Sequence, residues 1–125
     1  MAMVSEERPA TGVTVAQIAE RLQAEVLCCA DNTGEVVENL MIAAMTVDSG
    51  LDYFNRKGNK AVIVRAERPD CQLAALATST RCLVLTGGGR PNPQVLSFAE
   101  EKGVPMLLAK QDTLSAVAEM EKLFG

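Results

Sequence analysis

The chain has 125 residues, of which 48% are apolar and only 3% aromatic, and its formal net charge is −4 at pH 7. This length suits a single domain with a buried aliphatic core. The scattered basic residues argue against nucleic-acid binding, which needs clustered cations. The chain contains no histidine, which excludes Ser-His and Cys-His catalysis and removes the commonest metal ligand. We therefore predict no catalytic residue, no metal and no cofactor.

The N-terminal segment is polar and differs from the rest of the chain. Residues 1–12 include Pro9 and Gly12 and are predicted to form a disordered tail, whereas residues 13–125 form the α/β domain. The segment lacks the apolar core of a signal peptide, and no apolar run is long enough to span a bilayer. We therefore expect a cytoplasmic protein without a membrane partner.

The cysteines show no Cys-x-x-Cys pair. Cys28, Cys29, Cys71 and Cys82 are predicted to be buried thiols of a reducing compartment. Side chains of adjacent strand residues point to opposite faces of a sheet. We therefore expect that Cys28 and Cys29 cannot bind one metal ion without distortion.

Apolar runs and capping signals predict alternating helices and strands. Strands are predicted at about residues 25–29, 39–45, 61–64, 82–85 and 104–108. Helices are predicted at about residues 14–22, 46–57, 69–77, 92–102 and 112–124. Thr14 and Gln17 form a capping box, and Pro69 suits the first position of a helix.

Apolar spacing also indicates which side of each helix is buried. The inner face of the third helix is predicted to contain Leu73, Ala74, Leu76 and Ala77. The inner face of the last helix is predicted to contain Leu114, Val117, Met120 and Phe124.

The last four strands recur at a regular interval. They begin near residues 40, 61, 82 and 104, about 21 to 22 residues apart, which is the length of one compact βα unit. Successive units of this kind form a parallel sheet with helical crossovers. The sequence therefore predicts an α/β fold in one domain, a layered parallel sheet built from successive short βα units.

Polar and glycine residues follow the predicted strands, and the carboxyl ends of parallel strands meet at one edge. Thr86, the glycines 87–89 and Arg90 end one strand, while Arg65, Arg68 and Lys110 add cations nearby. Helix N-termini with cations can bind an anion.

Neither phosphate-binding fingerprint is present, however. The glycines could simply form a tight turn, and the arginines could be solvated or pair with Glu67 and Asp70. Helix capping equally explains Asp70 and Asp112.

From about Val13 to Phe124 the chain resembles the DRTGG domain family. The second half of the motif is intact as Thr86-Gly87-Gly88, and the first half reads Glu67-Arg68, with Glu in place of Asp. Further matches are Ala44-Met45, the segment 72–76, Gly103-Val104-Pro105 and Asp112-Thr113. The resemblance implies a regulatory or dimerisation domain that is usually not an enzyme. Such domains occur beside CBS domains in regulated pyrophosphatases and in the N-terminal region of some phosphotransacetylases.

These observations lead to two functional hypotheses. The first is a stand-alone, non-catalytic homodimer that binds a nucleotide or other anionic metabolite and acts on a CBS-domain protein or enzyme in trans. The predicted ligand-binding residues are Glu67, Arg68, Thr86, Gly87, Gly88, Arg90, Asp112 and Thr113. An exposed patch for dimerisation could include Met45, Leu51, Tyr53 or Met120. The alternative is a small transferase or hydrolase of a phosphorylated metabolite, with Arg65, Arg68 and Arg90 holding the phosphate.

Overall fold

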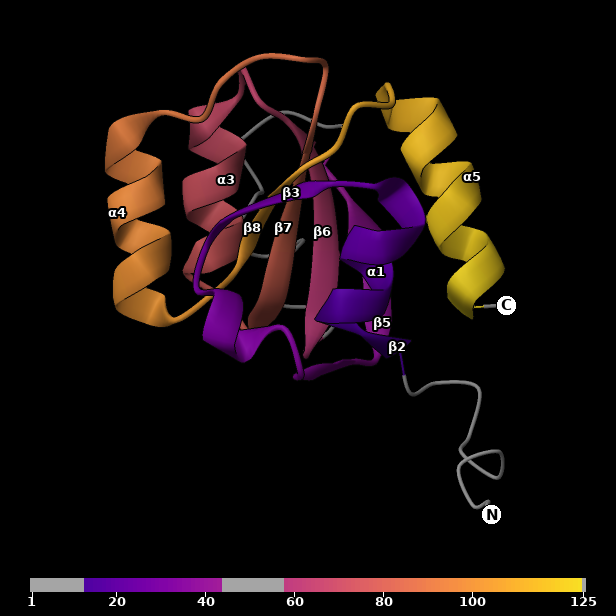
Figure 1. Cartoon of the computed structure of the whole chain (residues 1–125). Coiled ribbons are helices and arrows are strands. Elements are labelled where there is room, and N and C mark those ends of the chain that lie inside the picture. Colours follow the sequence, from indigo (N-terminus) through magenta and orange to yellow (C-terminus); the bar gives the residue numbers. More distant parts are fainter. Residues whose placement is uncertain (1–12, 44–57, 125) are drawn as a thin grey trace.

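A five-stranded sheet of order β3-β8-β7-β6-β5 lies between two layers of helices in the computed structural model (Figure 1). The structure describes residues 13–43 and 58–124. The strands are β3 (Glu25–Cys28), β5 (Asn39–Ile42), β6 (Lys60–Arg65), β7 (Thr80–Thr86) and β8 (Met106–Leu108). The helices are α1 (Val15–Leu22), α3 (Pro69–Leu76), α4 (Pro93–Lys102) and α5 (Thr113–Phe124). The strands β2 (Val13–Thr14) and β4 (Val36–Val37) form a small antiparallel sheet, and a 3₁₀ turn spans Ala30–Asn32.

The predicted parallel arrangement is confirmed for the four strands of the regular repeat. Neighbouring strands from β5 through β8 pair in parallel. The first strand of this sheet, β3, instead pairs antiparallel with β8 and forms the edge of the sheet. The start of β3 therefore lies at the same edge as the carboxyl ends of the other strands.

The central strand β7 divides the core into two halves. Leu83 and Leu85 pack on the side covered by α3 and α4, whereas Cys82 and Val84 pack on the side covered by α1 and α5. Alternating side chains are buried on both faces because helices cover both. The continuous apolar run in the sequence reflects this double burial.

Local signals define the ends of the helices as predicted. The Thr14 hydroxyl accepts a hydrogen bond from the Gln17 amide at 3.2 Å, and the Gln17 side chain accepts one from the Thr14 amide at 2.8 Å. These reciprocal contacts satisfy two amide groups that a helix start leaves without partners. At the end of α4, Gly103 adopts a left-handed conformation with φ +72°, which glycine accommodates without strain.

The predicted inner face of α3 is wrong at two positions. Leu73 and Ala77 are exposed, whereas Cys71, Gln72, Ala75 and Leu76 are buried. The buried face of α3 differs from the predicted face because it includes the polar Gln72, and apolar spacing cannot identify a buried polar residue. Similarly, Leu114 in α5 was expected in the core but is 81% exposed, while Ala116 and Met120 are fully buried.

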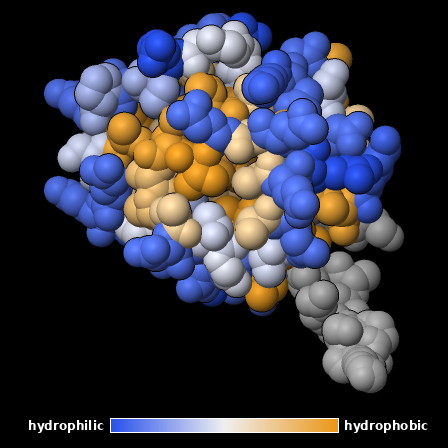
Figure 2. All heavy atoms as spheres, in the orientation of Figure 1, coloured by the Kyte–Doolittle hydropathy of each residue, from blue (hydrophilic) through white to orange (hydrophobic). Residues whose placement is uncertain are grey.

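On the face shown in Figure 2, apolar side chains gather in the area that β3 crosses between α4 and α1 in Figure 1, and hydrophilic residues surround them. Within the described part of the chain, no helix is long and apolar enough to cross a membrane. The predicted tail and the predicted helix at residues 46–57 lie outside the described residues.

Candidate functional site at the carboxyl edge of the sheet

The carboxyl ends of β6 and β7 are directly joined at one edge of the sheet, which is the upper edge in Figure 1. The Ala66 amide donates a hydrogen bond to the Thr86 carbonyl at 2.9 Å. The Ala109 amide likewise donates to the Leu85 carbonyl at 2.9 Å, so the end of β8 lies beside that of β7. The loops that follow these strands are therefore neighbours, as the sequence predicts.

Two predicted site residues contact one another through their hydroxyl groups. Thr86 Oγ1 lies 2.7 Å from Thr113 Oγ1, which joins the end of β7 to the start of α5. The Thr86 side chain is fully buried and Thr113 is half-buried. Thr86 therefore fixes the position of α5, and only Thr113 presents surface to solvent.

The turn after Thr86 consists of glycines because its backbone requires positive φ angles. Gly87 and Gly88 have φ values of +90° and +78°, in the region that side chains with a Cβ rarely adopt. Gly89 has an ordinary φ, but a Cβ there would lie 3.4 Å from the Cβ of Ala66. All three glycines are exposed, which leaves the backbone of the turn accessible to a ligand.

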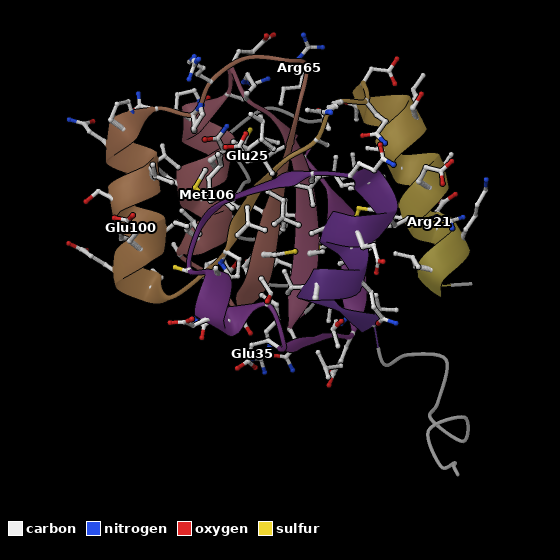
Figure 3. The ribbon with its side chains drawn as sticks, in the orientation of Figure 1. Arg21, Glu25, Glu35, Arg65, Glu100 and Met106 are labelled. Atoms are coloured by element: carbon white, nitrogen blue, oxygen red, sulfur yellow. The ribbon has the colours of Figure 1, made fainter. Side chains whose placement is uncertain are left out.

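The two acidic residues in the loop between β6 and α3 have ion-pair partners. Glu67 pairs with Arg65 at 2.8 Å and Asp70 pairs with Arg68 at 3.4 Å, both at exposed positions. Figure 3 shows Arg65 at the upper edge of the sheet. Exposed ion pairs of this kind contribute about 0–1 kcal/mol, so both arginines can exchange partners readily.

Asp112 caps the start of α5, which is the alternative to ligand binding that the sequence also indicates. Its carboxylate accepts a hydrogen bond from the Ser115 amide at 2.8 Å at the start of α5. The hydrogen bond from the Ser115 backbone lowers the pKa of Asp112 below its usual value. The carboxylate therefore stays ionised at neutral pH and adds negative charge beside Thr113.

Two cations at this edge have no such partner. Arg90, after the glycine turn, and Lys110, after β8, are both exposed. Neither forms an ion pair with any residue that the structure describes. These two side chains are therefore available to an anionic ligand.

A hollow of about 430 Å³ opens beside the glycine turn. Its lining consists of Gln23, Ala24, Glu25, Gly88, Leu108, Ala109 and Lys110. Sequence reasoning missed the contribution of Gln23–Glu25 because the direction of β3 was not known. The antiparallel pairing of β3 with β8 brings this segment to the carboxyl edge, where Figure 3 labels Glu25 on the front strand.

A buried glutamine supports the loop between β6 and α3. Gln72 is fully buried, and its amide nitrogen donates a hydrogen bond to the Arg65 carbonyl at 2.8 Å. Its side-chain oxygen has no hydrogen-bond partner within the described part of the chain. Gln72 therefore holds the loop that carries Glu67 and Arg68, a role that the sequence pattern did not indicate.

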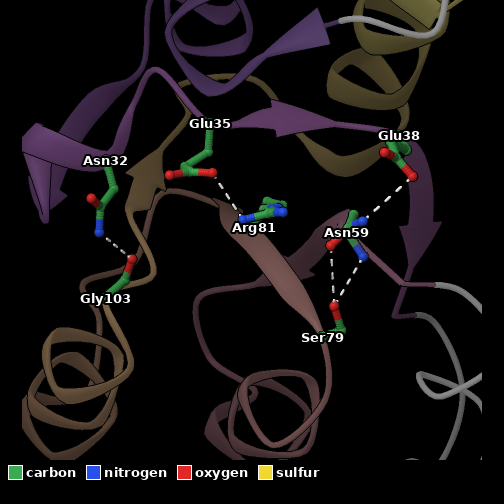
Figure 4. A network of polar contacts seen from close by, with 7 residues as sticks. All are labelled: Asn32, Glu35, Glu38, Asn59, Ser79, Arg81 and Gly103. Atoms are coloured by element: carbon green, nitrogen blue, oxygen red, sulfur yellow. Dashed lines mark hydrogen bonds and ion pairs between the residues drawn. The ribbon is translucent and has the colours of Figure 1, made fainter.

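The opposite edge of the sheet is tied together by polar contacts (Figure 4). Arg81 pairs with Glu35 at 2.9 Å, and Asn32 donates a hydrogen bond to the Gly103 carbonyl at 2.6 Å.

The buried Lys60 ammonium donates to the Thr78 hydroxyl at 2.7 Å and to the Ser79 carbonyl at 2.8 Å. Burial lowers the pKa of Lys60 to about 8. These contacts anchor the loops at this edge, where two hollows of about 250 and 370 Å³ are smaller than the hollow at the carboxyl edge.

The chain matches a known domain family. Residues 17–123 match the family model of the DRTGG domain. The chain belongs to the DRTGG domain family. The two segments that correspond to the motif of the DRTGG domain, Glu67-Arg68 and Thr86-Gly87-Gly88, lie at the same edge of the sheet. The backbone hydrogen bond from the Ala66 amide to the Thr86 carbonyl joins the loops that carry them.

A solved DRTGG domain has the same fold. It occurs in the crystal structure of the CBS and DRTGG domains of the regulatory region of Clostridium perfringens pyrophosphatase, complexed with the activator diadenosine tetraphosphate. The two folds agree with a TM-score of 0.73 at 19% sequence identity. The match covers 91% of the present chain but 47% of the other, so the present chain corresponds to about half of that regulatory region.

Proposed function

We propose that this DRTGG domain is a non-catalytic regulatory module that binds a nucleotide or another anionic metabolite at the carboxyl edge of its sheet. Membership of the family supports a regulatory role. The similar regulatory region of the pyrophosphatase is complexed with a nucleotide that carries several phosphates. The ligand proposed here is likewise a nucleotide or another anionic metabolite.

The proposal is carried by two exposed cations that form no ion pair with any described residue: Arg90, directly after the glycine turn, and Lys110, in the lining of the hollow. Arg90 and Lys110 can neutralise phosphate oxygens, and charge-assisted hydrogen bonds of this type are stronger than neutral ones. The exposed backbone at Gly87 and Gly88 permits close approach of a phosphate group. The hollow of about 430 Å³ falls within the range of small-molecule sites. Its apolar wall at Leu108 and Ala109 suits a nucleobase.

The proposal can be tested by calorimetric titration of the purified chain with ATP and with diadenosine tetraphosphate. We expect Arg90→Gln and Lys110→Gln each to weaken binding by about tenfold, which corresponds to roughly 1.4 kcal/mol. Lys102→Gln is the matched control, because it removes one exposed cation at the far end of α4. Equal loss in the control and the test variants would contradict a site at this edge.

The same samples distinguish binding from catalysis. After long incubation, chromatography of the nucleotide should recover it unchanged, since binding without turnover is proposed. Release of a dephosphorylated or transferred product, lost in the Arg90→Gln variant, would instead support the transferase or hydrolase hypothesis.

We also propose that the domain is a homodimer that acts on a CBS-domain protein or an enzyme in trans. Of the residues suggested for a dimer patch, Met120 is fully buried in the core and is unavailable. Met45, Leu51 and Tyr53 lie outside the described residues. Light scattering coupled to size-exclusion chromatography should give twice the mass of one chain, and a monomer at every concentration would contradict this proposal.

A further inference from the structure

The side chains of Cys28 and Cys29 lie on the same side of the sheet, which corrects the prediction that they point to opposite faces. Both belong to the apolar cluster on the side of α3 and α4. A bulge between Val26 and Cys28 interrupts the regular alternation of β3. Cys29 then adopts a left-handed conformation, with φ 58° and ψ 41°. These two irregularities together turn adjacent thiols toward the same neighbours.

The contacts of the two thiols bring them side by side. Cys28 Sγ donates to the Val104 carbonyl at 3.5 Å, and Cys29 Sγ donates to the Ala99 carbonyl at 3.8 Å. These carbonyls belong to one turn, because the Val104 amide donates to the Ala99 carbonyl at 2.9 Å. Burial, together with the neighbouring thiol of Cys29, raises the pKa of Cys28 to about 11.

We propose that Cys28 and Cys29 form a vicinal dithiol that a low-molecular-weight disulfide oxidises to an intramolecular disulfide. This modification site is distinct from the ligand site at the carboxyl edge and does not depend on it. The exposures of the two residues differ in the way that the reaction requires. Cys29 is half-buried and within reach of a reagent, whereas Cys28 is only 8% exposed.

The charges around the pair favour a disulfide over a metal complex. Two thiolates that hold a monovalent metal ion would leave a net negative charge in a half-buried place, which is costly. Glu100 on α4 adds to that cost, since its charge is one of the causes that raise the pKa of Cys28, after burial and the contact with Cys29. Among the residues described, no group of three or more potential ligands could complete a metal site. A disulfide, in contrast, is neutral.

The reaction proceeds by two thiol–disulfide exchanges. The Cys29 thiolate attacks one sulfur of the reagent, whose S–S bond breaks and releases one thiolate. Cys28 Sγ then loses its proton and attacks Cys29 Sγ, which breaks the mixed disulfide and releases the second thiol. Two electrons pass to the two sulfurs of the reagent, and the two protons lost by the cysteines leave on the released thiols.

The product should be easily reduced. Adjacent Cα atoms are about 3.8 Å apart, which is below the usual range of about 4.4–6.8 Å for a disulfide. Strained disulfides are more reducible, and the labile ones are those that regulate. Oxidation also removes the two S–H donors, so Cys28 at the end of β3 loses its contact to the Val104 carbonyl and Cys29 loses its contact to the Ala99 carbonyl.

The test is oxidation of the folded chain with oxidised glutathione, followed by alkylation of the remaining thiols and peptide mapping. In the wild type we expect a peptide containing Cys28 and Cys29 that is lighter by two hydrogens and is restored by dithiothreitol. In the Cys28→Ser variant the reaction should stop at one glutathionyl group on Cys29. The Cys28→Ser/Cys29→Ser variant is the control, because the buried Cys71 and Cys82 should not react.

Two outcomes would overturn the proposal. One is a stable glutathionyl group on Cys29 in the wild type, which would mean that Cys28 does not complete the second exchange. The other is no change in mass at this peptide while the chain remains folded by circular dichroism.

A second measurement examines the proximity of the thiols without oxidation. Phenylarsine oxide condenses with two neighbouring thiols to a neutral product and water. We expect native mass spectrometry to show one bound equivalent in the wild type and none in Cys28→Ser or in Cys29→Ser. Equal binding by either single variant would show that the thiols do not act as a pair.

Discussion

Thr86 Oγ1 and Thr113 Oγ1 lie 2.7 Å apart, so one hydroxyl contact connects the last residue of the central strand with the first residue of the final helix. This contact positions the start of α5 beside the glycine turn. The half of the DRTGG motif that is intact in this chain thus has a structural part, Thr86, and an accessible part, Gly87-Gly88.

The contribution of this contact can be measured with a double-mutant cycle. Thr86→Val retains the shape of the side chain but loses the hydroxyl, and we expect it to lower the free energy of unfolding by about 1 kcal/mol. Thr113→Val should add little in the background of Thr86→Val, because the pair is already broken. Urea titrations of the four proteins give the coupling energy. Fully additive losses would show that the hydroxyls do not interact.

The glycine turn should tolerate a methyl group at Gly89 but not at Gly88. Gly88→Ala meets no atom within 4 Å, yet its φ of +78° should cost about 1–2 kcal/mol of stability. Gly89→Ala has no such strain, and its Cβ makes an ordinary contact with Ala66, so the change should stay within about 0.5 kcal/mol. Thermal unfolding of the two variants provides the comparison. A loss at Gly89 equal to that at Gly88 would contradict the conformational explanation.

Lys60 should make stability depend on pH. Its pKa is lowered from 10.5 to about 8 by burial, so the folded chain carries an unfavourable buried charge below pH 8. Between pH 8 and 10.5 the folded state has released a proton that the unfolded state still holds. The free energy of unfolding should therefore rise with pH, by at most about 1.4 kcal/mol per pH unit from this group.

The Lys60→Met variant isolates this effect. Above pH 9 the raised pKa values of Cys28 and Cys82, about 11 and 12, act in the opposite direction, because only the unfolded state then ionises these thiols. Both proteins share that contribution, so the difference between their urea unfolding curves at pH 7 and pH 9 reports Lys60 alone. We expect the variant to gain stability relative to the wild type at pH 7 and less at pH 9. A difference independent of pH would refute the assignment.

Two apolar residues of α5 should respond very differently to truncation. Met120→Ala removes a fully buried side chain and should cost about 2–5 kcal/mol. Leu114→Ala changes a side chain that is 81% exposed, so stability should remain within about 0.5 kcal/mol. Calorimetric unfolding of both variants checks the prediction. A large loss for Leu114→Ala would indicate that a second chain covers this residue in solution.

Much of the architecture could be predicted because the relevant signals are local. Each described strand of the regular repeat contains a run of apolar residues, and the capping box at Thr14 specifies where α1 begins. The direction of β3 could not be predicted, since it depends on pairing with β8 far along the chain. For the same reason Gln23–Glu25 were not expected at the carboxyl edge.

The errors in the helices have a common physical cause. Apolar spacing does not identify a buried polar residue such as Gln72, which occupies an inner position because it hydrogen-bonds the Arg65 carbonyl. Leu114 follows the apolar pattern but is 81% exposed, because Ala116 of the same turn, which is fully buried, faces the core instead. The pairing of Cys28 with Cys29 arises from a bulge and a left-handed residue, neither of which periodicity reveals.

Among the described strands β3 pairs only with β8, and this edge position affects how the chain folds while it is being synthesised. Translation proceeds at roughly 5–20 residues per second, so β3 emerges several seconds before the strand that it must join. The parallel strands can assemble in order of synthesis, but β3 is incorporated only after the nascent chain has extended past Leu108.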